Sequence, residues 1–116
     1  MLLLFNTPWR EAVMNVARRN QQWLEPRWAT GLCIDASQIL QEELEQCGVA
    51  ASLYAGYQPK TLLPTDFVEH VFIVTMNDLA VDLTGRQFWP ACDFPIIEPL
   101  HEYRTRYLGE VGPYAG

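Results

Sequence analysis

The stretch that decides the fold is Phe67-Val-Glu-His-Val-Phe-Ile-Val-Thr75, followed by Met76-Asn-Asp78 and Leu79-Ala-Val-Asp-Leu83. The first run is rich in β-branched and aromatic residues, which favours a strand. The Asn-Asp pair that follows is typical of a turn, and the second run has the composition of a return strand. The stretch therefore predicts an antiparallel hairpin with strands at residues 67–75 and 79–83.

One polar side chain lies in each strand of this hairpin. Taken singly, His70 fits a core histidine bonded to a backbone carbonyl, and Asp82 fits a surface-facing residue or a turn acceptor. Both lie among apolar neighbours, however, where an unpaired polar group is costly. With a three-residue loop Thr75 pairs with Leu79, and His70 becomes the diagonal neighbour of Asp82 on the same face. A two-residue turn would place them on opposite faces, so a His–Asp pair requires a turn of odd length.

Upstream of the hairpin, a helix is predicted to begin near Thr30 or Gly31 and to end near Gln46. Its apolar positions recur at spacings of three and four, which predicts one buried face; they are Leu32, Cys33, Ala36, Ile39, Leu40, Leu44 and Cys47. Gly48 lies where a left-handed C-terminal cap is expected. With Thr30 as the N-cap, Cys33 is the third helical residue, where the helix dipole lowers the pKa of a thiol.

An earlier helix is predicted over about residues 9–24, with Thr7 as N-cap and Pro8 at its first position. Its apolar stripe contains Trp9, Val13, Val16 and Ala17. Residues 2–5 are expected to form an edge strand or a packed tail. After the second helix, residues 49–56 have the composition of a strand and residues 57–66, with two prolines, that of a loop.

The C-terminal part is less regular, because prolines interrupt it repeatedly. A short helix is expected over residues 99–108, and residues 112–116 are expected to be loose or packed on the surface. Helices that precede antiparallel strands predict an α+β fold. A length of 116 residues fits a single domain spanning residues 1–116.

Composition excludes several classes of protein. Hydrophobic residues make up 49% of the chain and charged residues 19%, which is ordinary for a globular domain. A net charge of −6 repels phosphate backbones, so no nucleic-acid partner is expected. The apolar residues 1–5 are too few for a secretory signal or a membrane span, so no membrane partner is expected either.

The three cysteines, Cys33, Cys47 and Cys92, form no C-x-x-C pair, so neither a metal nor another cofactor is expected. An odd number of cysteines without an export signal suits the cytoplasm, although a toxin-type export route is an alternative. Cys47 and Cys92 are interpreted as small buried hydrophobic residues. Cys33 is the exception, because its place at a helix start favours a reactive thiolate.

Together these residues predict a Cys–His–Asp triad. In this hypothesis Cys33 attacks an acyl carbon, and His70 takes the thiol proton and delivers it to the leaving group. Asp82 accepts a hydrogen bond from the other ring nitrogen and fixes the tautomer. The backbone N–H of Cys33 is the natural oxyanion donor.

The segment Gly31-Leu-Cys33-Ile-Asp-Ala-Ser37, with Gly48-Val-Ala-Ala51 after it, resembles the nucleophile helix and following strand of transglutaminase-like and papain-fold proteins. Glu69-His-Val-Phe-Ile-Val74 and Ala80-Val-Asp-Leu-Thr84 resemble the family's His strand and Asp-x-Thr strand. The resemblance covers roughly residues 28–90. It implies a papain-like (transglutaminase-like) fold, with N-terminal helices packed on a small antiparallel sheet. It also extends to papain-fold domains of bacterial toxins and effectors, some of which resemble glutamine deamidases.

Carried over residue by residue, the resemblance makes Cys33 the nucleophile, His70 the base and Asp82 the orienting acid. The chain departs from papain-type proteases at Arg27, where they carry a Gln six residues before the Cys. Trp28 and Gln22 are therefore the candidates for a second oxyanion donor or a substrate contact.

The sequence thus predicts a cysteine-dependent acyl-transfer enzyme acting on an amide bond of a protein or peptide, as a glutamine deamidase, a peptidase or a transglutaminase-like enzyme. A non-catalytic protein-binding module on the same fold is the alternative, with aromatic residues in its loops as the contact surface. A small antitoxin-like or regulatory protein is a third interpretation, based only on size and acidic charge. The oligomeric state is left open.

Overall fold

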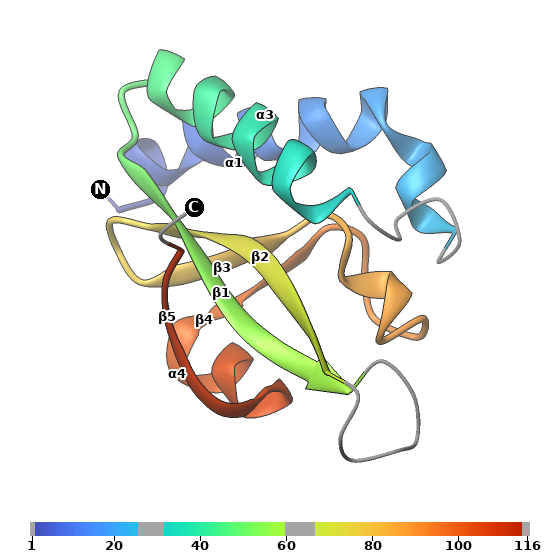
Figure 1. The fold of residues 1–116 in the computed structure, drawn as a ribbon. Coiled ribbons are helices and arrows are strands. Elements are labelled where there is room, and N and C mark those ends of the chain that lie inside the picture. The colour runs from blue at the N-terminus through green and yellow to red at the C-terminus, as the bar shows by residue number, and fades with distance from the viewer. Residues whose placement is uncertain (1, 26–31, 60–66, 115–116) are drawn as a thin grey trace.

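The computed structural model describes residues 2–25, 32–59 and 67–114 and has an α+β fold (Figure 1). Five antiparallel strands form one sheet in the order β4-β3-β2-β1-β5. Their bounds are β1 Ala51–Pro59, β2 Phe67–Thr75, β3 Leu79–Asp82, β4 Ile96–Pro99 and β5 Leu108–Pro113. The α-helices are α1 Leu2–Arg19, α3 Cys33–Gln46 and α4 Leu100–Tyr103. Short 3-10 helices are η1 Gln21–Leu24, η2 Gly85–Gln87 and η3 Arg104–Arg106. Of the helices described, none is long and apolar enough to cross a membrane.

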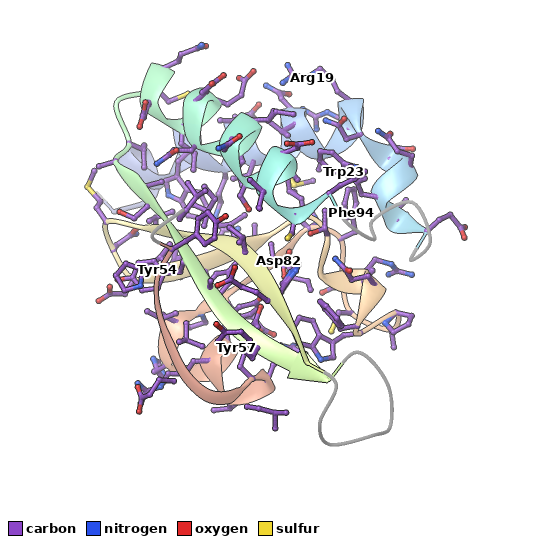
Figure 2. All side chains as sticks on the ribbon, in the orientation of Figure 1. Arg19, Trp23, Tyr54, Tyr57, Asp82 and Phe94 are labelled. Carbon is purple, nitrogen blue, oxygen red and sulfur yellow. The ribbon has the colours of Figure 1, made fainter. Side chains whose placement is uncertain are left out.

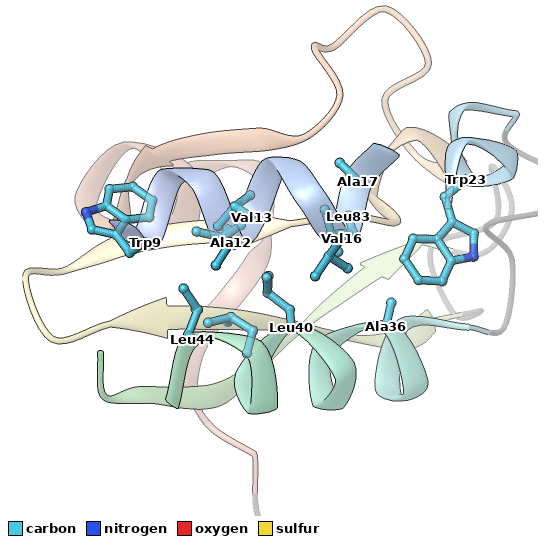
Figure 3. Close-up of a cluster of buried hydrophobic side chains, with 12 residues drawn as sticks. Trp9, Ala12, Val13, Val16, Ala17, Trp23, Ala36, Leu40, Leu44 and Leu83 are labelled. Atoms are coloured by element: carbon cyan, nitrogen blue, oxygen red, sulfur yellow. The ribbon is translucent and has the colours of Figure 1, made fainter. Parts of the chain in front are cut away.

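Helices α1 and α3 lie together on one face of the sheet, while α4 lies on the other (Figure 1). Side chains from the two long helices meet over the sheet, as Figure 3 shows. Burial of their apolar stripes is the main force that holds this layer in place. The cluster consists of Trp9, Ala12, Val13, Val16, Ala17, Trp23, Ala36, Leu40, Leu44, Ile73, Val81 and Leu83.

The opposite face of the sheet carries a second buried cluster. It contains Phe72, Val74, Ala80, Ile96, Tyr103 and Tyr107. Alternate residues of β2 therefore contact the two clusters in turn, with Phe72 on the side of α4 and Ile73 on the side of α1 and α3. This double burial explains why both strands of the hairpin are so apolar.

The hairpin between β2 and β3 has the predicted register. Ile73 pairs with Val81 and Val74 with Ala80, which sets Thr75 opposite Leu79 across a loop of residues 76–78. Asp78, the last loop residue, has a φ of 59°, the left-handed conformation typical of a three-residue hairpin loop. The prediction of an odd-length turn is confirmed.

The N-terminal helix begins earlier than predicted. Helix α1 runs through Thr7 and Pro8, so both the Thr7 N-cap and the edge strand over residues 2–5 are wrong. A proline lacks one N–H, so the helix forgoes the bond from Pro8 to the carbonyl of Leu4. The leucine-rich start has a high helix propensity, which favours continuation through this gap. The predicted last turn, up to residue 24, is instead the separate 3-10 helix η1.

Helix α3 begins with Leu32 as its N-cap, so Cys33 is its first residue rather than its third. The predicted N-cap, Thr30, lies outside the described residues. At the other end Gly48 has a φ of 77°, as predicted. Its N–H donates to the carbonyl of Glu45, and the N–H of Val49 donates to that of Leu44, which is a Schellman cap.

The buried face of α3 is narrower than its apolar pattern predicts. The residues that face the interior are Ala36, Ser37, Leu40 and Leu44. Ile39 is 40% exposed, and Cys47 is exposed as the C-cap, so its interpretation as a buried hydrophobic residue is wrong. Cys92 is half-buried against the second cluster. Helix α3 packs against the rest of the protein on one face, and its opposite face is exposed to solvent.

Two strands were not predicted. Strand β4 is short and bordered by prolines, and β5 contains two glycines and a proline, so neither has the composition of a strand. Pairing with a neighbouring strand compensates for this unfavourable composition. Strand β4 pairs with β3, and β5 pairs with the edge of β1. The helix expected over residues 99–108 is split into α4 and η3, and Gly112 and Pro113 belong to β5 rather than to a loose tail.

Candidate active site

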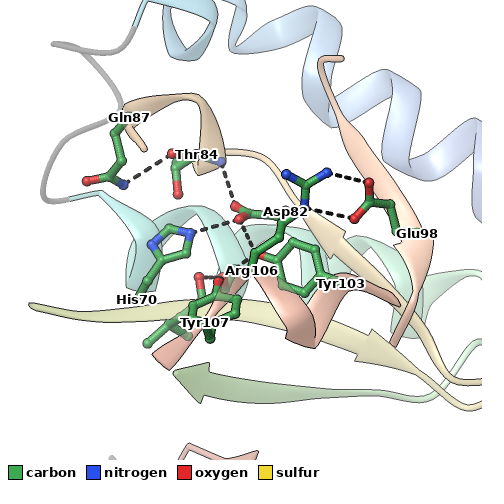
Figure 4. A network of polar contacts seen from close by, with 10 residues as sticks. His70, Asp82, Thr84, Gln87, Glu98, Tyr103, Arg106 and Tyr107 are labelled. Atoms are coloured by element: carbon green, nitrogen blue, oxygen red, sulfur yellow. Dashed lines mark hydrogen bonds and ion pairs between the residues drawn. The ribbon is translucent and has the colours of Figure 1, made fainter. Parts of the chain in front are cut away.

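His70 and Asp82 form a buried pair between adjacent strands. The imidazole Nε2 lies 2.8 Å from the carboxylate Oδ2, as Figure 4 shows, and the two residues are 1% and 2% exposed. The hairpin register produces this contact, because it places the two residues diagonally on the face that carries the second cluster. The pair lies in the middle of the molecule, where Figure 2 labels Asp82.

Three donors surround the Asp82 carboxylate. Its Oδ2 accepts from His70 Nε2 and also from the hydroxyl of Tyr103, at 2.5 Å. Its Oδ1 accepts from the backbone N–H of Thr84, at 3.0 Å. Burial raises the pKa of Asp82, but the charge and hydrogen bond of His70, then Tyr103 and Thr84, outweigh burial and hold the pKa below its usual 3.8. Asp82 is therefore an anion at neutral pH.

Cys33 lies on the other side of the imidazole. The side chain of His70 and the backbone of Val71 both act on its thiol and lower the pKa of Cys33. Because Nε2 contacts Asp82, Nδ1 is the ring nitrogen left to face the sulfur. Cys33 is half-buried. Three residues that are distant in the chain thus form one row of sulfur, imidazole and carboxylate.

The row favours a charged thiolate–imidazolium pair. Burial raises the pKa of Cys33, yet hydrogen bonds from His70 and Val71 and the nearby imidazolium charge lower it below the usual 9.0. Burial likewise lowers the pKa of His70, but the charge and hydrogen bond of Asp82, followed by those of Cys33, raise it from 6.5 to about 9. At neutral pH the imidazolium is therefore available as a proton donor, and the lowered pKa of Cys33 favours its sulfur as the nucleophile.

Helix α3 holds the sulfur against the strand that carries the imidazole. The hydroxyl of Ser37, one turn beyond Cys33, donates to the carbonyl of Val71 at 3.2 Å. The N–H of Ala36 makes the first bond of the helix, to Leu32 at 2.9 Å, so the N–H groups that precede it have no partner within the helix. The N–H of Cys33 is one of them, as the oxyanion role requires.

Aromatic rings enclose the imidazole. The rings of Phe88 and Trp89 lie nearly perpendicular to the imidazole, with distances between ring centroids of 5.0 Å and 6.4 Å. Tyr107 stacks on it at 6.4 Å with an angle of 17° between the planes. Gly56 pairs with His70 across the sheet and makes room for this stack, because a Cβ there would lie 2.5 Å from the ring of Tyr107. The β1–β5 register shifts at this point, between Ala55 and Tyr57.

Sequence reasoning missed the two tyrosines that complete the site. The hydroxyl groups of Tyr103 and Tyr107 lie 2.6 Å apart, and both side chains are buried. Burial and the nearby Asp82 charge raise the pKa of each phenol, so both keep their protons at neutral pH. Their spacing of four residues within the expected helix over residues 99–108 was the available signal, since such a pair shares one helix face.

The two candidates for a second oxyanion donor are not both placed. Trp28 lies outside the described residues. Gln22 is exposed in η1, and its amide donates to Asn20 at 3.3 Å rather than to a triad residue. The adjacent Trp23 is buried beside Ala36 (Figure 3), and its indole Nε1 has no hydrogen-bond partner among the residues that the structure describes.

Within the described ranges, no group of three or more His, Cys, Asp or Glu side chains lies close enough together to hold a metal ion. Searches with the chain against protein-family models, curated proteins and solved structures gave no match.

Proposed function

We propose that this chain is a cysteine-dependent acyl-transfer enzyme that cleaves an amide bond through Cys33, His70 and Asp82. The observation that carries the proposal is the position of His70, which bonds the Asp82 carboxylate through Nε2 and also interacts with the Cys33 thiol. An acid–base catalyst of this kind needs both contacts, one with the nucleophile and one with an orienting group.

The arrangement of elements supports a papain-like, transglutaminase-like assignment for the fold. The candidate nucleophile opens a helix that packs on the sheet, and the histidine and aspartate follow on neighbouring antiparallel strands. The order Cys, His, Asp along the chain is the same as in the family that the sequence resembles.

The proposed reaction proceeds in two halves. The Cys33 thiolate attacks the carbonyl carbon of an amide, and the oxyanion that forms accepts from the N–H of Cys33. The His70 imidazolium gives its proton to the departing nitrogen, the C–N bond breaks and a thioester remains. A water molecule, or an amine in a transfer reaction, then attacks the thioester and gives a proton to His70. Collapse of the second intermediate releases the acyl product and restores the thiolate.

The substrate is proposed to be a protein or peptide. A net charge of −6 favours neutral or basic partners through long-range attraction. Deamidation, proteolysis and transamidation share the first half of the reaction and differ in the departing amine and in the acceptor. The type of product is therefore the direct way to distinguish them.

Mass spectrometry of candidate protein substrates, incubated with the wild type and with Cys33→Ala, tests the proposal. Replacement of a Gln amide by a carboxylate identifies a deamidase, new peptide ends identify a peptidase, and isopeptide-linked products identify a transglutaminase-like enzyme. The exposed Cys47 and His101 provide matched controls, because Cys47→Ala and His101→Gln should keep full activity while Cys33→Ala and His70→Gln lose it. Products that persist in Cys33→Ala would contradict the proposal.

The non-catalytic binding module is the outcome to expect if none of these products forms and Cys33 is as slow to alkylate as Cys47. Such a module has no need for a thiol in hydrogen-bond contact with a buried imidazole. Labelling with iodoacetamide at mildly acidic pH separates the two cases without knowledge of the substrate.

A further inference from the structure

We propose that Tyr103 and Tyr107 are positioning residues of the active site, which orient the Asp82 carboxylate and thereby tune the Cys33–His70 pair. This inference rests on the proposed function and adds a second layer to it. Its basis is a chain of hydrogen bonds that ends on the carboxylate oxygen used by the imidazole.

The direction of this chain follows from counting hydrogens. A phenol has a single hydrogen, and that of Tyr103 points to Oδ2 of Asp82. The contact between the two hydroxyl groups must then use the hydrogen of Tyr107, with the oxygen of Tyr103 as acceptor. Tyr107 therefore donates to Tyr103, and Tyr103 donates to Asp82. A hydroxyl that accepts one hydrogen bond becomes a stronger donor in the next.

Both tyrosines act on an oxygen that is already shared. Oδ2 accepts from Tyr103 and from Nε2 of His70, so the two donors compete for the same negative charge. The Tyr103 hydroxyl stabilises the anion without adding a net charge. Removal of that hydroxyl leaves more of the carboxylate charge to the imidazolium, which keeps its proton to a higher pH.

The surroundings make this competition strong. Tyr103 and His70 are at most 1% exposed and Asp82 is 2% exposed, so water screens their interactions weakly. The titratable groups that face His70 are Cys33 from α3, Asp82 from β3 and Tyr107 beyond η3; β1 presents Gly56. Arg106, which bonds Glu98, acts on Tyr107 and opposes the rise in its pKa.

The arrangement of the rings allows the hydroxyl groups to be removed without removal of the packing. Tyr103 contacts Phe72 at 4.6 Å and Trp89 at 5.9 Å between ring centroids, and a phenylalanine keeps both contacts. Tyr103→Phe and Tyr107→Phe therefore separate hydrogen bonding from packing. Tyr54→Phe is the matched control, because Tyr54 is half-buried and also packs on Phe72, with ring centroids 6.2 Å apart.

The test is the pH dependence of Cys33 alkylation by iodoacetamide, with the signal of Cys33→Ala subtracted. In the wild type we expect two inflections, the lower from Cys33 and the upper from His70. Tyr103→Phe should move the upper inflection to higher pH by about one unit. Tyr107→Phe should move it in the same direction by less, and Tyr54→Phe should leave it unchanged.

The ring protons of His70 provide a second measurement, since the chain has two histidines and His101→Gln assigns the signals. Their titration by NMR in Tyr107→Phe reports the shift even if Tyr103→Phe folds poorly. An upper inflection that stays at the wild-type pH in both variants would overturn the inference while leaving the proposed function intact. A wild-type Cys33 that titrates as a free thiol would instead contradict the proposed function.

Discussion

Gly85 lies directly against the carboxylate of Asp82, so close that a Cβ on residue 85 would be 2.6 Å from Oδ2. The same atom would be 2.6 Å from Cδ1 of Ile96. Both neighbours are buried, so neither has space to withdraw into. We expect Gly85→Ala to lower the free energy of unfolding by about 1–3 kcal/mol, the usual cost of overpacking, as measured by urea denaturation.

Gly112→Ala is the matched control for this change, because a Cβ at Gly112 meets nothing within 4 Å. Its effect should stay within about 0.5 kcal/mol of zero. Gly85→Ala should also slow the alkylation of Cys33, since displacement of the carboxylate weakens its hold on His70. Equal destabilisation by the two alanines would show that the contact with Asp82 is loose.

The second prediction concerns the reactivity of the three thiols. Iodoacetamide at mildly acidic pH should modify Cys33 faster than the exposed Cys47, even though Cys33 is half-buried. The reason is the lowered pKa of Cys33, which keeps a larger fraction of it as thiolate. Peptide mapping by mass spectrometry measures both rates in one sample, and His70→Gln should abolish the difference.

The third prediction concerns the role of Asp82 as an anion. Asp82→Asn keeps the shape of the side chain but removes the charge that holds the imidazole protonated. We expect the turnover rate to fall by about 10³–10⁴, as for a triad with the wrong histidine tautomer. The upper inflection of Cys33 alkylation should move to lower pH. Exposed Asp93→Asn is the control, and a similar loss in both variants would argue against a specific role.

The fourth prediction is a dependence of stability on pH. The pKa of His70 is raised from 6.5 to about 9, so its contribution to stability is complete below pH 6.5 and is lost as the pH rises through about 9. The pKa of Asp82 is lowered, so its contribution is complete above pH 3.8 and is lost as the pH falls through its folded value.

Thermal unfolding from acid to alkaline pH measures both contributions. Cys33, whose pKa is lowered from 9.0, adds stability as the pH rises and opposes the alkaline loss, so Cys33→Ala is the background of choice. In that background the melting temperature of an Asp82→Asn variant should vary less with pH on both sides. Parallel curves for the two proteins would contradict the coupling of His70 and Asp82.

The fifth prediction concerns the core beneath α3. Leu40 is 1% exposed within the α1–α3 cluster, so Leu40→Ala should cost about 2–5 kcal/mol of the free energy of unfolding. The adjacent Ile39 is 40% exposed, and Ile39→Ala should cost less than about 1 kcal/mol. Urea denaturation of the two variants tests whether α3 packs on the sheet through the face that carries Leu40. Similar costs would contradict the orientation of the helix.

The hairpin could be predicted because its information is local. Strand composition, the loop length and the alternation of faces were enough to bring His70 beside Asp82, and the observed register agrees with each step. The Gly48 cap was predictable for the same reason, since only a few neighbouring residues determine it. Cys33 was recognised from its place at a helix start, although the N-cap lies two residues later than predicted.

The C-terminal part could not be predicted, because its structure depends on distant partners. Strand β5 forms through pairing with β1, and nothing in its own composition indicates a strand. Tyr103 and Tyr107 are ordinary aromatic residues in the sequence, and their role becomes visible only when α4 and η3 lie over Asp82. The start of α1 differs from the prediction because the leucines before Pro8 favour a helix strongly enough to continue past the proline.

Gly56 pairs with His70, and the ring of Tyr107 packs against Gly56. This arrangement has a consequence for the order of folding. The β2–β3 hairpin closes a short loop and is entropically cheap to form, so histidine and aspartate meet early. Docking of the C-terminal tyrosines must wait for a contact between distant stretches of chain. Until that contact forms, the side of the imidazole on which Tyr107 stacks is open to water.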